Sequence, residues 1–172
     1  MKKKIGKLFE DINKWFQANQ LTLNYNKTNY LQFTNKNSSD YNLKLQYQGN
    51  EVKSTLNKKF LGVIINDCLS WKAHIDQIAS KLNTACFAIR TIQAIMSPET
   101  LRIVYFAYVH SIQSYGITFW GNQPYSDKIF KIQKRAIRII TNSRMRDSCT
   151  ELFKNWKYYH YTLNISFPYQ YL

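Results

Sequence analysis

The sequence predicts an α+β fold in two parts: a helix with short antiparallel strands over residues 1–66, then an all-α bundle over residues 70–154. The first observation is that short alternating segments separated by polar turns, typical of strands, dominate the first part. The second is that apolar residues recur every three or four positions in the second part, which predicts helices. The third is Ser97-Pro98-Glu99, a capping residue followed by a first-turn proline and an acid, which marks a helix start. Residues 155–172 show no clear helical face and are expected to form a divergent tail.

The first part begins with an amphipathic helix, expected over Lys3–Asn19, whose wide aromatic face suits packing on a sheet. Alternation over Leu21–Tyr25 and the β-forming residues of Thr28–Thr34 predict extended structure. Gly49-Asn50 is typical of a hairpin turn. The short apolar run Phe60–Ile65 predicts a buried strand.

The second part contains three expected helices. The first runs from Trp71 to about Ile95, the second from the Ser97 cap to about Phe119, and the third over about Ser126–Thr141. Gly121-Asn122 and Pro124 should separate the second helix from the third.

The net charge of the chain is +14, from 24 Lys and Arg against 10 Asp and Glu. Such an excess indicates phosphate backbones or anionic surfaces as partners, although an AT-rich gene that favours Lys and Asn codons would also produce it. Three scattered cysteines suggest no disulfide framework and favour an intracellular setting. The basic start lacks the apolar segment of a signal peptide, and no apolar run reaches bilayer length. We therefore expect a protein of the nucleus or cytoplasm with no membrane contact.

A run of cations in the third expected helix is the best candidate for a binding surface. Seven cations occur between residues 128 and 146 with no acid among them. They are Lys128, Lys131, Lys134, Arg135, Arg138, Arg144 and Arg146. The first five recur at spacings of three and four, so they form one stripe opposite the isoleucines, and a nucleic-acid backbone would match it. An ordinary solvated helix face is the alternative.

Five segments in order give this chain a family resemblance. They are Trp15–Phe33, Phe60–His74, Tyr115-Gly116, Trp120-Gly121 and Gln133–Arg138. Together they resemble the reverse transcriptases of jockey-like, insect-type non-LTR retrotransposons. In that family a helix ending in Trp leads into an L-x-L-N-x-x-K-T strand, a primer-grip hairpin follows, and the thumb carries recurring W-G and Q-K-x-A-x-R patterns. The resemblance covers about residues 8–154 and implies the end of the palm, the primer grip and the thumb.

The resemblance also implies roles for particular residues. Lys27 matches a lysine thought to act as a general acid toward the departing pyrophosphate, and Leu61 and Gly62 match the primer grip. The cations of the third helix match the thumb surface that faces RNA or an RNA–DNA primer-template. The intact parent would use Mg²⁺ held by an aromatic-x-Asp-Asp turn, which would lie upstream of Met1. Only Glu10 and Asp11 are adjacent acids, so we expect this chain to hold no metal and, alone, to be inactive as a polymerase.

Two other functions remain open from the sequence. One is a helix-turn-helix DNA reader with Ser126–Thr141 as recognition helix, although that helix lacks a surface of Asn, Gln or Ser for reading bases. The other is a remnant without a selected function. Tyr115 and Trp120 could stack on bases, although an aromatic residue near a helix end more often packs in the core.

Overall fold

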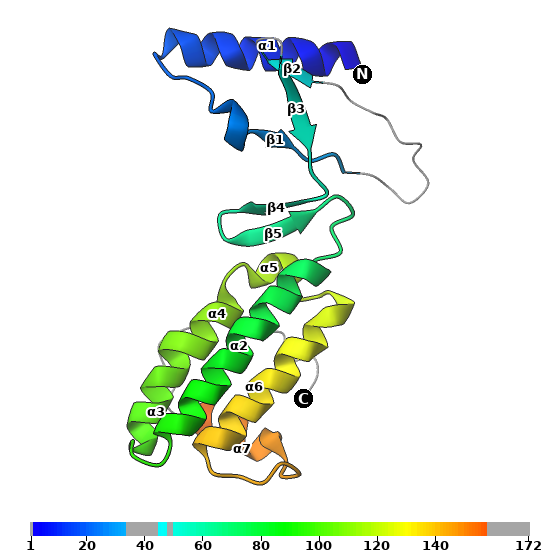
Figure 1. The fold of residues 1–172 in the computed structure, drawn as a ribbon. Coiled ribbons are helices and arrows are strands. Elements are labelled where there is room, and N and C mark those ends of the chain that lie inside the picture. Colours follow the sequence, from blue (N-terminus) through cyan, green and yellow to red (C-terminus); the bar gives the residue numbers. More distant parts are fainter. Residues whose placement is uncertain (1, 34–44, 48–49, 158–172) are drawn as a thin grey trace. The chain divides into compact units, whose positions relative to one another are not determined.

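The computed structural model describes residues 2–33, 45–47 and 50–157 (Figure 1). The chain divides into two compact units, Met1–Ser70 and Trp71–Leu172. The first combines one long helix with short strands, and the second is helical. The expected α+β class is therefore confirmed.

A small sheet forms in the first unit after helix α1, Lys2–Ala18. Strands β1 (Asn29–Tyr30), β2 (Leu45–Tyr47) and β3 (Asn50–Ser54) pair in the order β1-β3-β2. The expected hairpin is present as the antiparallel pair β2–β3, with Tyr47 opposite Asn50, while Gly49 lies outside the described residues. The expectation of purely antiparallel strands is wrong, because β1 pairs with β3 in parallel. The local hairpin uses one edge of β3, and β1 adds to the other edge.

The extended structure expected between α1 and this sheet is largely absent. Residues 21–24 form no strand, and Tyr25–Lys27 (η1) is a single turn of 3-10 helix. The backbone N–H of Lys27 donates to the backbone O of Asn24 at 3.1 Å and to its Oδ1 at 3.2 Å. An asparagine side chain bonded in this way favours a turn over a strand. Only Asn29 and Tyr30 of the expected strand Thr28–Thr34 pair, and Thr34 lies outside the described residues.

A two-stranded hairpin follows, made of β4 (Asn57–Phe60) and β5 (Val63–Asn66). Its turn residues, Leu61 and Gly62, have φ of 46° and 85°. Positive φ at both positions is typical of the type I′ turn, whose twist matches that of paired strands. The prediction of one buried strand over Phe60–Ile65 is wrong, because the chain reverses inside this run. Leu61 at the tip is 74% exposed.

The apolar face of α1 is only partly covered. Ile5, Phe9 and Phe16 are half-buried, whereas Leu8 and Trp15 are exposed. This face suits packing on a sheet, as the sequence indicates, but only part of it is buried. The neighbouring strands of two, three and five residues offer too little area to bury it.

The helical unit is built around two long helices that lie side by side, α2 (Lys72–Ile92) and α6 (Asp127–Ile140) (Figure 1). Between and after them come α3 (Pro98–Val104), the π-helical segment η2 (Tyr105–His110), α4 (Ser111–Ser114), α5 (Ile117–Trp120), the 3-10 turn η3 (Pro124–Ser126) and α7 (Cys149–Lys157). The core draws on most of them, including Ile75, Leu82, Ile89, Leu101, Val109 and Ile137. The first and third expected helices are thus confirmed.

The second expected helix begins as predicted but ends early. Ser97 is the cap, and its Oγ accepts a hydrogen bond from the Thr100 N–H at 3.3 Å. The helix stops at Ser114 and not at Phe119, because Tyr115 is extended and Gly116 adopts φ 64°. A left-handed residue ends a helix, and glycine takes that conformation without steric cost.

The last described helix, α7, continues to Lys157, beyond the predicted boundary at residue 154. Residues 158–172, most of the expected tail, lie outside the described part of the chain. Along the described residues, no helix is long and apolar enough to cross a membrane.

Candidate nucleic-acid interface

Helix α6 separates apolar from cationic residues. Its isoleucines and Ala136 are buried against the rest of the unit. Lys128, Lys131 and Arg135 are exposed, and Lys134 and Arg138 are half-buried. The predicted row therefore lies outside the core face of the helix.

Two cations at one edge of the row are tied to α2. The Nζ of Lys128 lies 2.7 Å from Oδ1 of Asp76, and the Arg135 guanidinium donates to Oδ1 of Asn83. The Lys128–Asp76 pair is about half exposed, so it contributes little to stability and leaves the ammonium accessible to solvent. These contacts fix the edge of α6 that faces α2.

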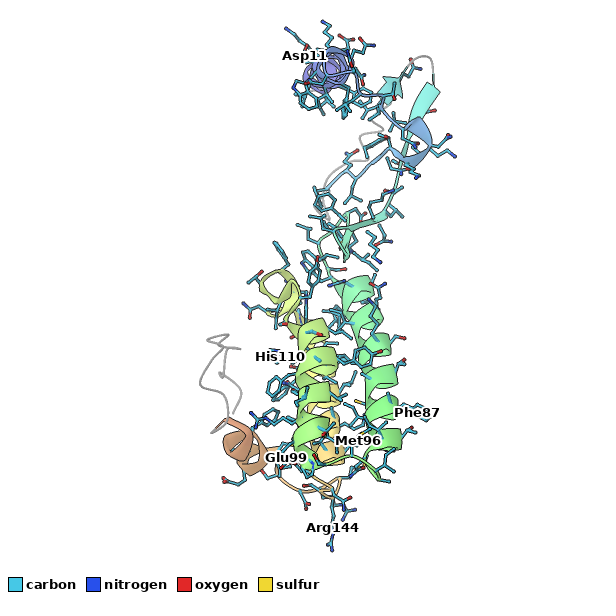
Figure 2. All side chains as sticks on the ribbon, turned by 90° about the vertical axis from the view of Figure 1, so that its left-hand side faces the viewer. Asp11, Phe87, Met96, Glu99, His110 and Arg144 are labelled. Atoms are coloured by element: carbon cyan, nitrogen blue, oxygen red, sulfur yellow. The ribbon has the colours of Figure 1, made fainter. Side chains whose placement is uncertain are left out.

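The opposite edge holds the loop that follows α6. Arg138 donates from Nε and Nη2 to the backbone O of Asp147, at 3.2 and 3.0 Å. The Asp147 carboxylate in turn accepts the Arg144 backbone N–H at 2.7 Å. Arg138 therefore positions the loop that carries Arg144 and Arg146 next to the cations of α6. Figure 2 shows Arg144 pointing away from the bundle at this end of the unit.

Lys134 lies on the same edge as Arg138. Its Nζ is 4.2 Å from the centre of the Phe130 ring, which stacks on Phe153 of α7 at 6.2 Å. A cation over an aromatic face is stabilised by the ring quadrupole, so Lys134 is oriented as well as charged.

Three of the seven cations have no side-chain partner within the described residues, and we call them the uncommitted cations. Lys131, Arg144 and Arg146 are exposed, and within the described ranges no hydrogen bond or ion pair joins their side chains to another residue. We call the seven cations from Lys128 to Arg146 the α6 surface. Because no acid occurs within this segment, at least the charge of Lys131, Arg144 and Arg146 is available to an anionic partner.

The other residues implied by the resemblance belong to the first unit. Lys27 is exposed at the end of η1, and Leu61 and Gly62 form the tip of the β4–β5 hairpin. The helical unit therefore brings together the seven cations, while Lys27, Leu61 and Gly62 lie in the other unit.

Trp120 packs in the core, the outcome that the sequence favours over stacking on bases. Trp120 is 1% exposed, and its Nε1 donates to the backbone O of Tyr115 at 3.2 Å. Its sequence neighbour Phe119 is 62% exposed and stacks on Trp71, with ring centres 6.0 Å apart and planes 22° apart. The sequence gives no sign of which of two adjacent aromatics faces the core. Tyr115 itself is exposed.

Two titratable groups in the helical unit are shifted by burial. Burial lowers the pKa of His74, and the nearby charge of Lys81 lowers it further. Burial raises the pKa of the Cys86 thiol, which lies in the core. Among the residues that the structure describes, no group of three or more His, Cys, Asp and Glu could hold a metal ion.

Comparison with known proteins returns no relative. No protein-family model, curated protein or solved structure matches this chain. Function is therefore inferred from the chemistry of the α6 surface and from the resemblance of the sequence.

Proposed function

We propose that this chain is the nucleic-acid-gripping part of a non-LTR retrotransposon reverse transcriptase, made of the end of the palm, the primer grip and the thumb. The observation that carries the proposal is the α6 surface, a row of cations on one helix and its following loop. Its partner is RNA or an RNA–DNA hybrid, held through the phosphate backbone.

The dimensions of α6 suit a backbone ligand. At about 1.5 Å of rise per residue, Lys128 and Arg138 lie about 15 Å apart along the helix. Successive phosphates of one strand advance by about 3.4 Å along a duplex axis, so the row is longer than the spacing between neighbouring phosphates. A helix that lies along a strand can therefore neutralise several phosphates together.

The composition of α6 favours phosphate contacts over base reading. Gln133 is the only amide side chain in the helix, and it is buried with its Nε2 donating to the Tyr105 hydroxyl at 3.0 Å. The exposed positions carry Lys and Arg, which bind phosphates of any sequence. We therefore favour binding without sequence preference over a helix-turn-helix reader.

The proposal assigns binding, and no nucleotide addition, to this chain. Two-metal phosphoryl transfer requires closely placed carboxylates that hold both ions. Lys27, Leu61 and Gly62 would act only beside the catalytic segment of an intact parent. Primer extension by the purified chain with Mg²⁺ or Mn²⁺ should give no product above background.

The decisive experiment removes the uncommitted cations. A triple variant, Lys131→Ala, Arg144→Ala and Arg146→Ala, deletes three charges whose side chains form no hydrogen bond or ion pair within the described part of the chain. Binding to an RNA–DNA hybrid, measured by fluorescence anisotropy across a salt series, should be about micromolar or weaker at physiological salt. The slope of log K against log salt should flatten by about 2 to 3, close to 0.9 per lost phosphate contact.

The matched control is Lys81→Ala, which removes an exposed lysine of α2 outside the α6 surface. Its slope should stay within about 0.3 of the wild-type value. Equal slopes for the triple variant and the wild-type chain would refute the proposal. Circular dichroism of each variant should match the wild-type spectrum, because none of the changed side chains is buried.

A further inference from the structure

An aromatic cluster lies at the end of the helical unit where α2 and α6 begin. Trp71 directly precedes α2, Phe119 lies in α5, and Tyr125 lies in η3, which contacts both long helices. Figure 1 shows α5 beside the start of α2. Phe119 is 62% exposed and Tyr125 is 47% exposed.

The cluster is supported from the core side. The Trp71 ring meets the buried His74 edge-on at 6.3 Å, and His74 meets Trp120 edge-on at 6.2 Å. Trp120 is itself fixed by its hydrogen bond to Tyr115. Four rings thus connect the exposed face of Phe119 to the core, and such backing holds the outer ring in place. A fixed ring loses little entropy when a flat ligand stacks on it.

Cations flank the cluster. The Nζ of Lys72 lies 5.6 Å from the centre of the Tyr125 ring, within the range of a cation–π contact. Lys128, the first cation of the α6 surface, follows Tyr125 by three residues at the start of α6. Both lysines therefore lie near the cluster, at the starts of α2 and α6.

We propose that Phe119, with Trp71 and Tyr125, forms a stacking platform for an unpaired base of the strand whose phosphates lie along the α6 surface. The inference rests on the proposed function and adds a preference for single strands. Exposed aromatic rings beside a cationic groove are the features by which proteins hold single strands without reading sequence. The flanking Lys72 and Lys128 disfavour an apolar protein partner and favour a polyanion.

The experiment separates base stacking from phosphate binding. Affinity is measured by anisotropy for oligo(dA) and for an abasic strand of the same length, which keeps the phosphates and lacks the bases. Wild-type chain should bind oligo(dA) at least about five-fold more tightly than the abasic strand. Phe119→Leu, which keeps an apolar side chain but removes the aromatic face, should reduce this ratio toward one, with the salt slope unchanged. Phe119→Trp should retain it.

A second variant and a matched control complete the design. Tyr125→Leu should lower the ratio as well, whereas Tyr108→Leu should not, because Tyr108 is similarly exposed, at 41%, but lies in η2 outside the cluster. A wild-type ratio near one, or an unchanged ratio in both cluster variants, would overturn the inference and leave the α6 proposal standing if binding still depends on salt.

Two other outcomes would also overturn the inference. Failure of the wild-type chain to bind either strand would overturn the inference, and failure to bind the RNA–DNA hybrid as well would overturn the proposed function with it. If Phe119→Leu changed the oligomeric state in sedimentation while the binding ratio stayed constant, the cluster would be a protein contact, and the inference would be overturned.

Discussion

Gln113 of α4 provides a direct test of the packing in the helical core. Its side chain is 0% exposed, and within the described part of the chain neither Oε1 nor Nε2 has a hydrogen-bond partner. A second buried glutamine, Gln133, does have one, the Tyr105 hydroxyl at 3.0 Å. The same substitution at these two positions should therefore have opposite effects on stability.

Gln113→Met replaces the amide with an apolar group of similar length. Leaving a buried polar group unpaired costs about 1–3 kcal/mol, so this variant should raise the free energy of unfolding by about 2 kcal/mol. Gln133→Met should lower it by about 1 kcal/mol, because the Tyr105 hydroxyl loses a donor. With a urea m-value of about 2 kcal/mol per molar, the midpoints should move by about 1 M upward and about 0.5 M downward.

The assay is urea unfolding of the full chain, followed by circular dichroism at the helical minimum and by tryptophan fluorescence. The two probes should agree for each variant, since Trp120 lies in the same core as the helices. Destabilisation by Gln113→Met equal to that by Gln133→Met would refute the reasoning. It would show that the Gln113 amide is hydrogen-bonded in solution, for example to a buried water.

Two further predictions concern His74 and the β4–β5 turn. Because the pKa of folded His74 is lowered, the unfolded chain takes up a proton near pH 6.5 that the folded chain does not. Stability should therefore fall as pH drops below about 6.5, until folded His74 is protonated too, and His74→Phe should flatten this fall in urea titrations; an equally steep fall in the variant would contradict the assignment. Leu61→Asn should stabilise the chain by about 1 kcal/mol, because leucine is strained at φ 46° and Asn-Gly suits a type I′ turn. A lower urea midpoint would show instead that contacts of Leu61 outweigh this strain.

Local features were predictable from the sequence. The period of the apolar residues predicts α1, α2 and α6 to within a few residues, because a helix is defined by hydrogen bonds between neighbours in the chain. The same reasoning predicts the Ser97 cap, whose partner is Thr100. The cationic side of α6 also follows from spacing alone, since residues three and four apart share one face of a helix.

Features that depend on distant segments were decided by the tertiary structure. The parallel pairing of β1 with β3 could not be predicted from two short strands, and the reversal at Leu61-Gly62 divides a run that looked like one strand. The sequence also leaves open which aromatic of the pair Phe119 and Trp120 enters the core. The break at Gly116 and the packing against α2 bury Trp120 and leave Phe119 on Trp71.

The tertiary structure also decided which cations of the α6 surface have side-chain partners. Lys128 and Arg135 are tied to α2, and Arg138 holds the following loop. Lys131, Arg144 and Arg146 keep exposed side chains. By itself, the sequence determined the charge of this surface and its place on one helix, because both follow from residue type and local period. Only the tertiary structure decided which charges are paired within the fold, because the partners of Lys128 and Arg135 lie 52 residues away in α2 and that of Arg138 lies in the loop after α6.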